Sequence, residues 1–388
     1  MIKTTLVLIV LLAICGCNNN FPSEKAESAS PIINIKIDLS KSISKVLLKD
    51  ILDSSTFCFL GRQSDCVIGE VDKILYHNNR YYILDKLQFS VIVFDDAGNF
   101  IFRFCQKGPG PKEYTFMNDF TIFEDRLCIL DSNAILVYTL SGEYLKKVRL
   151  DFTATRLENI DDKYFAFFRH SNTERAKKLN FDLIVTDDNG NVQKRYFPYS
   201  DIDDKNNITT KQSFYVNNDE VSYIQRFNDT IYTFQNSSIA PKYVIDFGKY
   251  KIPSNPLENS KFQEFAYFIK DFQETSNVVV FSFTYSNTVY HAIYDKVTKE
   301  ILCYRSYSTD DRFFIKGSSP VIRVDDSLVS IFEPYDLAAL LQDLKSNRQS
   351  DYDEFVETYP QLSPLFKYIA NEPINPIMIF EKYKRIEK

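Results

Sequence analysis

The amino-acid sequence predicts an all-β fold assembled from repeated sheets, and three observations lead to this prediction. First, the 388 residues include 33 Phe and 25 Tyr but no Trp, so side chains that pack well on pleated sheets are abundant. Second, one pattern of strands and turns recurs along the chain. Third, turns that contain Gly separate several of the apolar runs, and such turns are typical of short hairpins.

The repeat is clearest in its first two copies, residues 79–85 and 125–131, whose final residues Asp85 and Asp131 stand 46 positions apart. In each copy a second strand, a turn with Gly98 or Gly142 and a third strand follow, and the third copy repeats this turn with Gly190. Later strands are expected at residues 164–168, 182–186, 221–224, 230–234, 278–283, 291–295, 299–304, 321–324 and 328–332. A period a little below about 50 residues is typical of propeller blades rather than of helical repeats.

Six such units predict a six-bladed β-propeller of four-stranded antiparallel blades over residues 32–388. Many strands, such as Ile135 to Tyr138, are apolar throughout, as expected when both faces of a sheet are covered. Blades stacked around an axis provide that cover and leave only short edges. A repeat array also accommodates more than the roughly 250–300 residues at which a single core stops growing.

The first 17 residues have the pattern of an export signal. Lys3 gives a positive start, Leu6 to Ile14 form an apolar run, and this run is shorter than the about 20 residues of a membrane-spanning helix. Residues 14–17 resemble the bacterial lipobox, which implies cleavage before Cys17 and acylation of its thiol. Residues 18–31 are polar and predict a flexible stalk.

The C-terminal part departs from the repeat. Leucines at helical spacing from Leu337 to Leu344, followed by Phe355, predict helices, and we expect residues 334–372 to form a helical insertion in the last blade. Residues 375–380 return to a strand pattern that completes this blade. We expect Ile33 to Leu39 to pair with that strand and close the ring.

Four segments, residues 67–74, 82–85, 93–100 and 107–114, resemble in their order and spacing the six-bladed β-propeller lipoproteins of Bacteroidetes, which look like NHL-repeat propellers. This resemblance implies a propeller tethered to the cell envelope, with an outer-membrane or periplasmic location. This chain departs from the family pattern at one place. In the family an acidic Glu-Thr pair usually follows the strand that corresponds to residues 57–60, whereas this chain has Gly61 and Arg62 there.

Five cysteines follow Cys17: Cys58, Cys66, Cys105, Cys128 and Cys303. None belongs to a C-x-x-C pair, so a zinc ribbon or a thioredoxin-like site is not indicated. A disulfide between Cys58 and Cys66 is one alternative in an oxidising compartment. Buried free thiols are the other, and we expect them for the remaining cysteines.

The most unusual local sequence is residues 107–114, in which two Gly-Pro steps fix an irregular turn. Lys107, Glu113 and Tyr114 are the candidate ligand-binding residues, on the interpretation that this loop contacts a ligand at the mouth of the channel. The alternative is a plain connector between blades. No phosphate-binding loop is indicated, because no Gly-Lys-Ser/Thr follows.

Other candidate groups are interpreted as structural. Asp85 and Asp131 occupy equivalent positions, so we expect hydrogen bonds made once in each blade rather than a catalytic pair. His77, His170 and His291 are dispersed, and we expect no metal site and no cofactor. Two triplets resemble bacterial O-glycosylation acceptors, namely residues 229–231 and 326–328.

A formal charge of −6 with interspersed acids and bases gives no nucleic-acid footprint. No nucleophile motif is present, so catalytic residues are predicted to be absent. The leading hypothesis is a membrane-anchored, non-enzymatic binding or scaffold module for a glycan, peptide or protein partner. The alternative is a lactonase- or lyase-like propeller enzyme that acts on a sugar with a divalent cation, and fold alone does not choose between the two.

Overall fold

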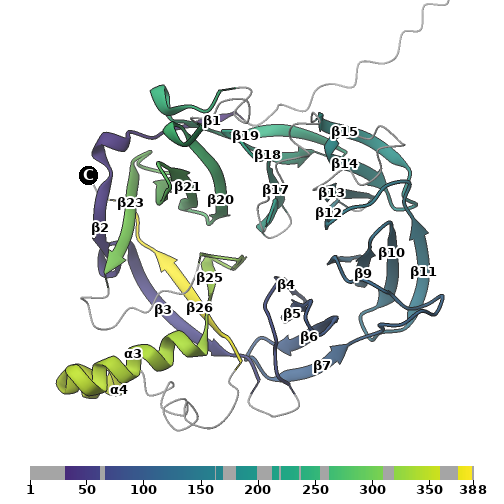
Figure 1. Cartoon of the computed structure of the whole chain (residues 1–388), viewed down its shortest axis with the longest axis horizontal. Helices are drawn as coiled ribbons and strands as arrows, with labels where there is room; N and C mark the ends of the chain where they lie inside the picture. The colour runs from purple at the N-terminus through teal and green to yellow at the C-terminus, as the bar shows by residue number, and fades with distance from the viewer. Residues whose placement is uncertain are drawn as a thin grey trace, which may run out of the picture. The chain divides into compact units, whose positions relative to one another are not determined.

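The computed structural model describes residues 31–61, 66–161, 163–168, 181–198, 212–217, 220–235, 237–253, 262–308, 319–358 and 375–386. The chain divides between Pro31 and Ile32, and the architecture below is that of the second unit. Six sheets surround a central axis in this unit (Figure 1). The predicted six-bladed propeller with four-stranded antiparallel blades is therefore confirmed.

Each blade runs from an innermost strand at the axis to an outermost strand at the rim. Blade 1 contains β4 (Lys73–His77), β5 (Arg80–Asp85), β6 (Ser90–Asp95) and β7 (Phe100–Phe104); blade 2 contains β8 (Asp119–Phe123), β9 (Arg126–Asp131), β10 (Ala134–Thr139) and β11 (Tyr144–Arg149); blade 3 contains β12 (Arg156–Asp161), β13 (Tyr164–Phe168), β14 (Phe181–Asp187) and β15 (Val192–Pro198). Blade 4 contains β16 (Phe214–Asn217), β17 (Glu220–Ile224), β18 (Thr230–Gln235) and β19 (Ser238–Asp246); blade 5 contains β20 (Ala266–Glu274), β21 (Val278–Tyr285), β22 (Thr288–Asp295) and β23 (Ile301–Ser308); blade 6 contains β24 (Ile322–Val324), β25 (Ser327–Phe332), β26 (Ile377–Tyr383) and β3 (Leu52–Phe59).

The N-terminal segment follows the outer edge of three blades in turn. β1 (Ile33–Lys36) adds a fifth, parallel strand to β19, and β2 (Ile43–Leu47) does the same at β23. β3 then forms the outermost strand of blade 6, antiparallel to β26 (Figure 1). The expectation that Ile33 to Leu39 closes the ring was therefore wrong. Closure is made by β3, whose eight residues form a longer ladder with β26 than the four of β1 could form.

The predicted helical insertion in the last blade is present between β25 and β26. It contains α3 (Pro334–Asn347), which begins with Pro at a position where the missing amide costs nothing, and α4 (Gln349–Thr358). The rest of the predicted insertion, residues 359–372, lies outside the described residues. The described residues contain four further short helices: α1 (Leu48–Ile51) and the 3-10 helices η1 (Leu39–Lys41), η2 (Gly248–Tyr250) and η4 (Phe262–Glu264). Among the described residues, no helix has the length and hydropathy of a membrane span.

Apolar side chains fill the spaces between neighbouring blades. Between blades 1 and 2, for example, Tyr82, Leu84, Phe120 and Leu136 are fully buried together. The hairpin turns between the third and fourth strands of blades 1, 2 and 3 contain Gly98, Gly142 and Gly190, each with a φ between 81° and 95°. The predicted turns are thus confirmed, because non-glycine residues rarely adopt this conformation.

The described cysteines are thiols rather than members of a disulfide. Cys58 and Cys66 are both buried, and the disulfide considered for them is not formed. Cys128 and Cys303 are buried free thiols in β9 and β23, as expected, and burial raises the pKa of each thiol to about 12. Cys105 is the exception, because it is exposed.

Candidate functional site

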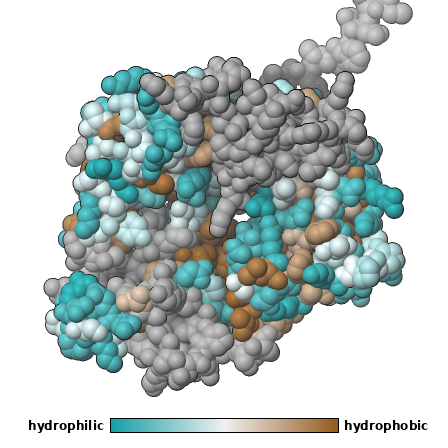
Figure 2. All heavy atoms as spheres, viewed as in Figure 1, coloured by the Kyte–Doolittle hydropathy of each residue, from teal (hydrophilic) through white to brown (hydrophobic). Residues whose placement is uncertain are grey.

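Inner strands from five blades converge on a small cavity at the axis, which we call the axial cavity. It lies where these strands begin, and its volume is about 60 Å³. Six charged residues line it: Asp72, Lys73, Lys86, Asp119, Arg156 and Glu158. Gln212 and Ser213 add neutral polar groups, and Figure 2 shows hydrophilic and hydrophobic residues meeting near the centre of the ring. The axial cavity is the candidate functional site.

Lys73 of β4 connects blades 1, 2 and 3 at this site. Its Nζ lies 2.8 Å from Glu158 Oε2 and 3.5 Å from Asp119 Oδ2. It also donates to the main-chain carbonyls of Phe120 (2.8 Å) and Leu157 (3.0 Å). These contacts satisfy the ammonium group within the protein, so Lys73 holds the inner strands together.

Glu158 of β12 is a buried acid of the cavity, with an exposed fraction of 3%. Burial raises its pKa, although the ion pair with Lys73 and the hydrogen bond from Thr121 oppose that shift. Asp119 is buried to a similar degree, and its Oδ2 accepts a hydrogen bond from the amide of Leu157 at 2.9 Å. Both acids are therefore engaged by neighbouring groups at the base of the cavity.

Lys86 and Arg156 stand nearer to solvent than these acids. The Nζ of Lys86 lies 4.0 Å from Asp72 Oδ1, too far for a close ion pair. Burial lowers the pKa of Lys86, and the charges of Arg156 and Lys73 lower it further. Arg156 donates to the carbonyl of Thr155 at 3.1 Å. Two cations thus lie together in the outer part of the cavity, and an anionic group placed there would reduce the repulsion between them.

The loop singled out from the sequence lies between β7 and β8, and none of its residues lines the axial cavity. Tyr114 is fully buried, and its hydroxyl donates to the carbonyl of Phe89 at 2.6 Å. Glu113 Oε2 accepts from the amide of Gly110 at 2.8 Å. Lys107 is exposed, with its Nζ 3.2 Å from the centre of the Phe89 ring. These contacts fit a connector between blades, and a ligand role for the three residues stays a prediction.

Asp85 and Asp131 make equivalent hydrogen bonds in blades 1 and 2. Asp85 accepts from the amide of Gly69, 16 residues upstream, at 2.6 Å. Asp131 accepts from the amide of Thr115, also 16 residues upstream, at 3.3 Å. Each carboxylate therefore ties the connection that enters its blade to the end of the second strand, which is the structural role expected from the repeat.

The remaining candidates lie apart from one another. His77 pairs with Asp125 at 2.6 Å, His291 lies in blade 5, and His170 is outside the described residues. Among the described residues, no three His, Cys, Asp or Glu side chains are grouped as a metal would require. Thr230 and Ser327 of the two glycosylation-like triplets are both buried, with exposed fractions of 9%.

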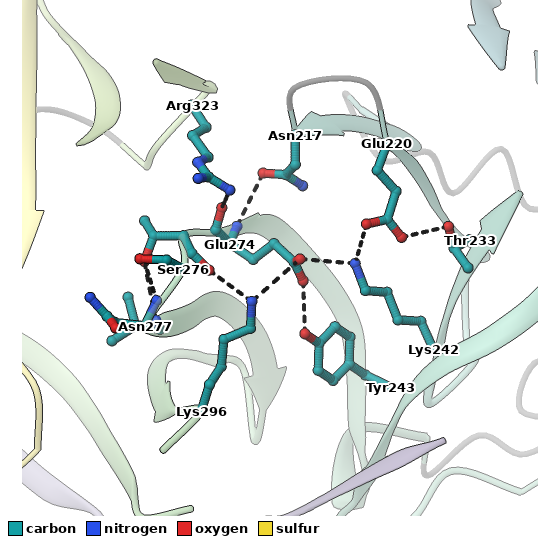
Figure 3. Close-up of polar contacts among 12 residues, drawn as sticks. Asn217, Glu220, Thr233, Lys242, Tyr243, Glu274, Ser276, Asn277, Lys296 and Arg323 are labelled. Carbon is teal, nitrogen blue, oxygen red and sulfur yellow. Dashed lines mark hydrogen bonds and ion pairs between the residues drawn. The ribbon is translucent and has the colours of Figure 1, made fainter. Parts of the chain in front are cut away.

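A second polar cluster lies where β16 and β20 end, at the opposite ends of the inner strands (Figure 3). Glu274 is central to it. Its carboxylate contacts Lys242 at 2.9 Å, Lys296 at 3.5 Å and the Tyr243 hydroxyl at 2.8 Å. Burial disfavours the charge of Glu274, yet these partners more than offset burial and its pKa is lowered. This cluster joins blades 4 and 5 and is interpreted as structural.

Sequence reasoning missed the residues of the axial cavity. Lys73 and Lys86 are in blade 1, whereas Asp119 is in blade 2 and Arg156 and Glu158 are in blade 3. No local motif joins them, since only the ring brings their strands together. One signal was present: charged residues stand at or near the start of three of the inner strands, β4, β8 and β12, where most strand residues are apolar.

The ring has known structural relatives. A protein of Bacteroides fragilis, described as a "Putative exported protein", is 23% identical to this chain with a TM-score of 0.71, and the match covers 92% of this chain and 100% of the other. A member of the DUF4221 family from Bacteroides vulgatus is 10% identical with a TM-score of 0.45, and the match covers 87% of this chain and 98% of the other. The first likeness shows a shared fold.

No curated protein matches the chain. Residues 31–382, which include every strand of the ring except the last residue of β26, match the family model described as "Domain of unknown function (DUF4934)". The resemblance to six-bladed propellers is confirmed at the level of the fold. The protein is therefore a six-bladed β-propeller that belongs to the DUF4934 family.

Proposed function

We propose that this protein is a lipid-anchored binding module of the cell envelope and that its axial cavity holds the anionic group of an acidic glycan. The single observation that carries the proposal is that Lys86 and Arg156, two cationic side chains from different blades, line the outer part of the same cavity, so that the charge of Arg156 lowers the pKa of Lys86. Lys73 adds a third cation deeper in the cavity, where Glu158, Asp119 and two carbonyls engage it.

The size of the cavity supports recognition of a group rather than of a whole ligand. About 60 Å³ is well below the roughly 300–1,000 Å³ of pockets that enclose a drug-sized molecule. A carboxylate or sulfate fits this volume, and the rest of the ligand would lie outside the cavity. Leu87 and Phe116 are exposed in two connections between strands, Leu87 after β5 and Phe116 before β8. Both connections lie at the strand ends where the axial cavity is found, and the two side chains offer apolar surface for a sugar ring. This apolar surface favours a glycan over a peptide.

The test is a calorimetric titration of the full-length chain with glucuronate, with glucose as the neutral match. Lys86→Met and Arg156→Met should each weaken glucuronate binding by roughly ten- to hundredfold, since a hydrogen bond to a charged group contributes about 1.5–3 kcal/mol. Lys147→Met, which removes an exposed cation from β11, is the control and should change nothing. Raised salt should also weaken binding.

Two outcomes contradict the proposal: equal binding of glucuronate and glucose, or glucuronate affinity unchanged in both cavity variants. A tripeptide such as trialanine could also bind through its terminal carboxylate. If it binds more tightly than glucuronate and displaces it, the ligand of the axial cavity is a peptide rather than a glycan.

One observation favours the enzymatic alternative as a second candidate. Acids from three blades do converge at the axial cavity, and burial raises the pKa of Glu158, a property common in general acids. An enzyme that cleaves acidic sugars would lose turnover in Glu158→Gln while still binding glucuronate. A binding module would show no turnover of uronic-acid oligosaccharides and lactones in the wild type.

The anchor is proposed from the sequence alone, since Cys17 lies outside the described residues. The apolar run and the Gly16-Cys17 step support export and acylation, with an outer-membrane location. Metabolic labelling with a palmitate analogue should mark the wild-type chain but not Cys17→Ala, because the variant lacks the thiol that would be acylated. An unlabelled wild-type chain would disprove the anchor.

A further inference from the structure

A second cavity lies between blades 5 and 6 and has the opposite electrostatic character. Its volume is about 260 Å³. Its polar and aromatic lining comes from β20 to β23 of blade 5 and from β26 of blade 6: Asp271, Ser282, His291, Tyr304, Tyr307 and Tyr383. No Lys or Arg is among the described residues that line it. We call it the interblade cavity.

The backbone of β20 is distorted where it supplies Asp271. The pairing of β20 with β21 shifts register between Tyr267 and Lys270 and again between Lys270 and Gln273. Asp271 lies inside the second shift and has a φ of 55°, in the left-handed region that costs free energy for a non-glycine residue. Bulges of this kind re-aim side chains and are common beside functional sites.

Only one oxygen of Asp271 is used within the protein. Ser282 donates a hydrogen bond to Oδ2. Oδ1 accepts no hydrogen bond from the residues that the structure describes, and Asp271 is only partly buried at the cavity wall. His291 stands opposite Ser282 on the neighbouring strand and stacks on the Tyr304 ring, with centroids 5.4 Å apart. The carboxylate is thus held in place with one oxygen available to a ligand.

The far wall of the cavity adds tyrosine rings, with a buried glutamate behind one of them. The Tyr383 hydroxyl donates to Glu381 Oε2 at 3.1 Å, and Ser330 donates to Oε1 of the same carboxylate at 2.7 Å. Glu381 is fully buried behind this wall. Tyr307, by contrast, is exposed, with an exposed fraction of 37%, and supplies an aromatic ring at the edge of the cavity.

We propose that the interblade cavity binds a small ligand through a primary ammonium group, which pairs with Asp271 and lies against the tyrosine rings. A carboxylate combined with aromatic faces, and with no Lys or Arg among the described residues of its lining, is the chemistry that selects ammonium ions. The volume suits a body the size of one amino sugar, since drug-sized ligands need roughly 300–1,000 Å³. This site is separate from the axial cavity in residues and in the charge that it selects.

The experiment is ligand-observed NMR with the full-length chain and two matched probe pairs: glucosamine against glucose, and ethanolamine against ethylene glycol. At least one amine should bind more tightly than its neutral match. Asp271→Asn should weaken that amine by roughly tenfold or more, as expected for a lost charged hydrogen bond. Asp96→Asn, at an exposed turn of blade 1, should leave its binding unchanged.

Equal binding of amines and neutral matches, or amine binding unchanged in Asp271→Asn, would overturn the proposal. If Asp271→Asn does not fold, Tyr307→Ala provides the same test through the loss of one ring, and unchanged amine binding there would also overturn it. Glucuronate binding should be the same in Asp271→Asn as in the wild type, so failure of this site and failure of the axial site are distinguishable.

Discussion

Glu158 and Glu274 are both buried glutamates on inner strands, yet their pKa values move in opposite directions. Burial raises the pKa of Glu158, and its single lysine partner does not reverse that shift. For Glu274 burial acts in the same direction, but two lysines and a tyrosine hydroxyl offset it and the pKa is lowered. The number of partners, rather than burial, therefore decides the sign.

These shifts give opposite pH dependences of stability. A lowered pKa means that Glu274 stabilises the fold above its unfolded value of 4.5, and that this contribution is lost as the pH falls through the folded pKa. For Glu158 the raised pKa means that ionisation costs stability as the pH rises above 4.5, and that this cost is absent below it.

Glu274→Gln should lower the free energy of unfolding by about 1.5–3 kcal/mol near neutral pH, because a buried charged network loses its acid. The deficit should begin to shrink as the pH falls below 4.5 and should be lost once the pH passes the lowered folded pKa, where the folded wild-type carboxylate becomes protonated. Urea unfolding at several pH values measures both effects. Glu143→Gln, at an exposed turn, is the control, and a deficit that stays constant with pH would refute the explanation.

Tyr114 shows how far single residues could be predicted. The sequence suggested that Glu113 and Tyr114 would emerge together as a polar and aromatic pair. In the structure Tyr114 enters the core between blades 1 and 2, and Glu113 folds back onto the Gly110 amide. The Gly-Pro steps correctly indicated a rigid turn, but the direction of each side chain depends on the neighbouring blade.

Strands could be predicted better than their partners. The expected strands in all six blades are present, because apolar runs and Gly turns are local signals. The closing strand was misassigned, because β1 and β3 both lie near the N-terminus and both can extend a sheet. Their partners depend on the path of the chain around blades 4, 5 and 6.

The closure by β3 and β26 gives a prediction at this scale. Met378 of β26 is fully buried opposite Cys58 of β3. Met378→Ala should lower the free energy of unfolding by about 2–5 kcal/mol, as expected for a large-to-small change in a core. Lys382→Ala in the same strand is exposed and should stay within about 0.5 kcal/mol of the wild type. Chemical denaturation tests this, and equal effects of the two variants would mean that β26 does not close the ring.

For the whole molecule, the repeat predicted the architecture but not the site. Six copies of one unit were sufficient to infer a propeller, since each blade needs its neighbours to bury its faces. The axial cavity takes its residues from five blades, and the interblade cavity depends on a distorted strand and on the chain end that completes blade 6. Neither arrangement is encoded in a contiguous motif.

The central claim is that the axial cavity recognises an anionic group, and a crystal structure of the full-length chain with glucuronate tests it most directly. We predict six blades and a carboxylate within hydrogen-bonding distance of Lys86 Nζ or of the Arg156 guanidinium, with Lys73 still paired to Glu158. Glucuronate bound elsewhere on the ring, or an axial cavity that remains empty at saturating ligand, would contradict the claim.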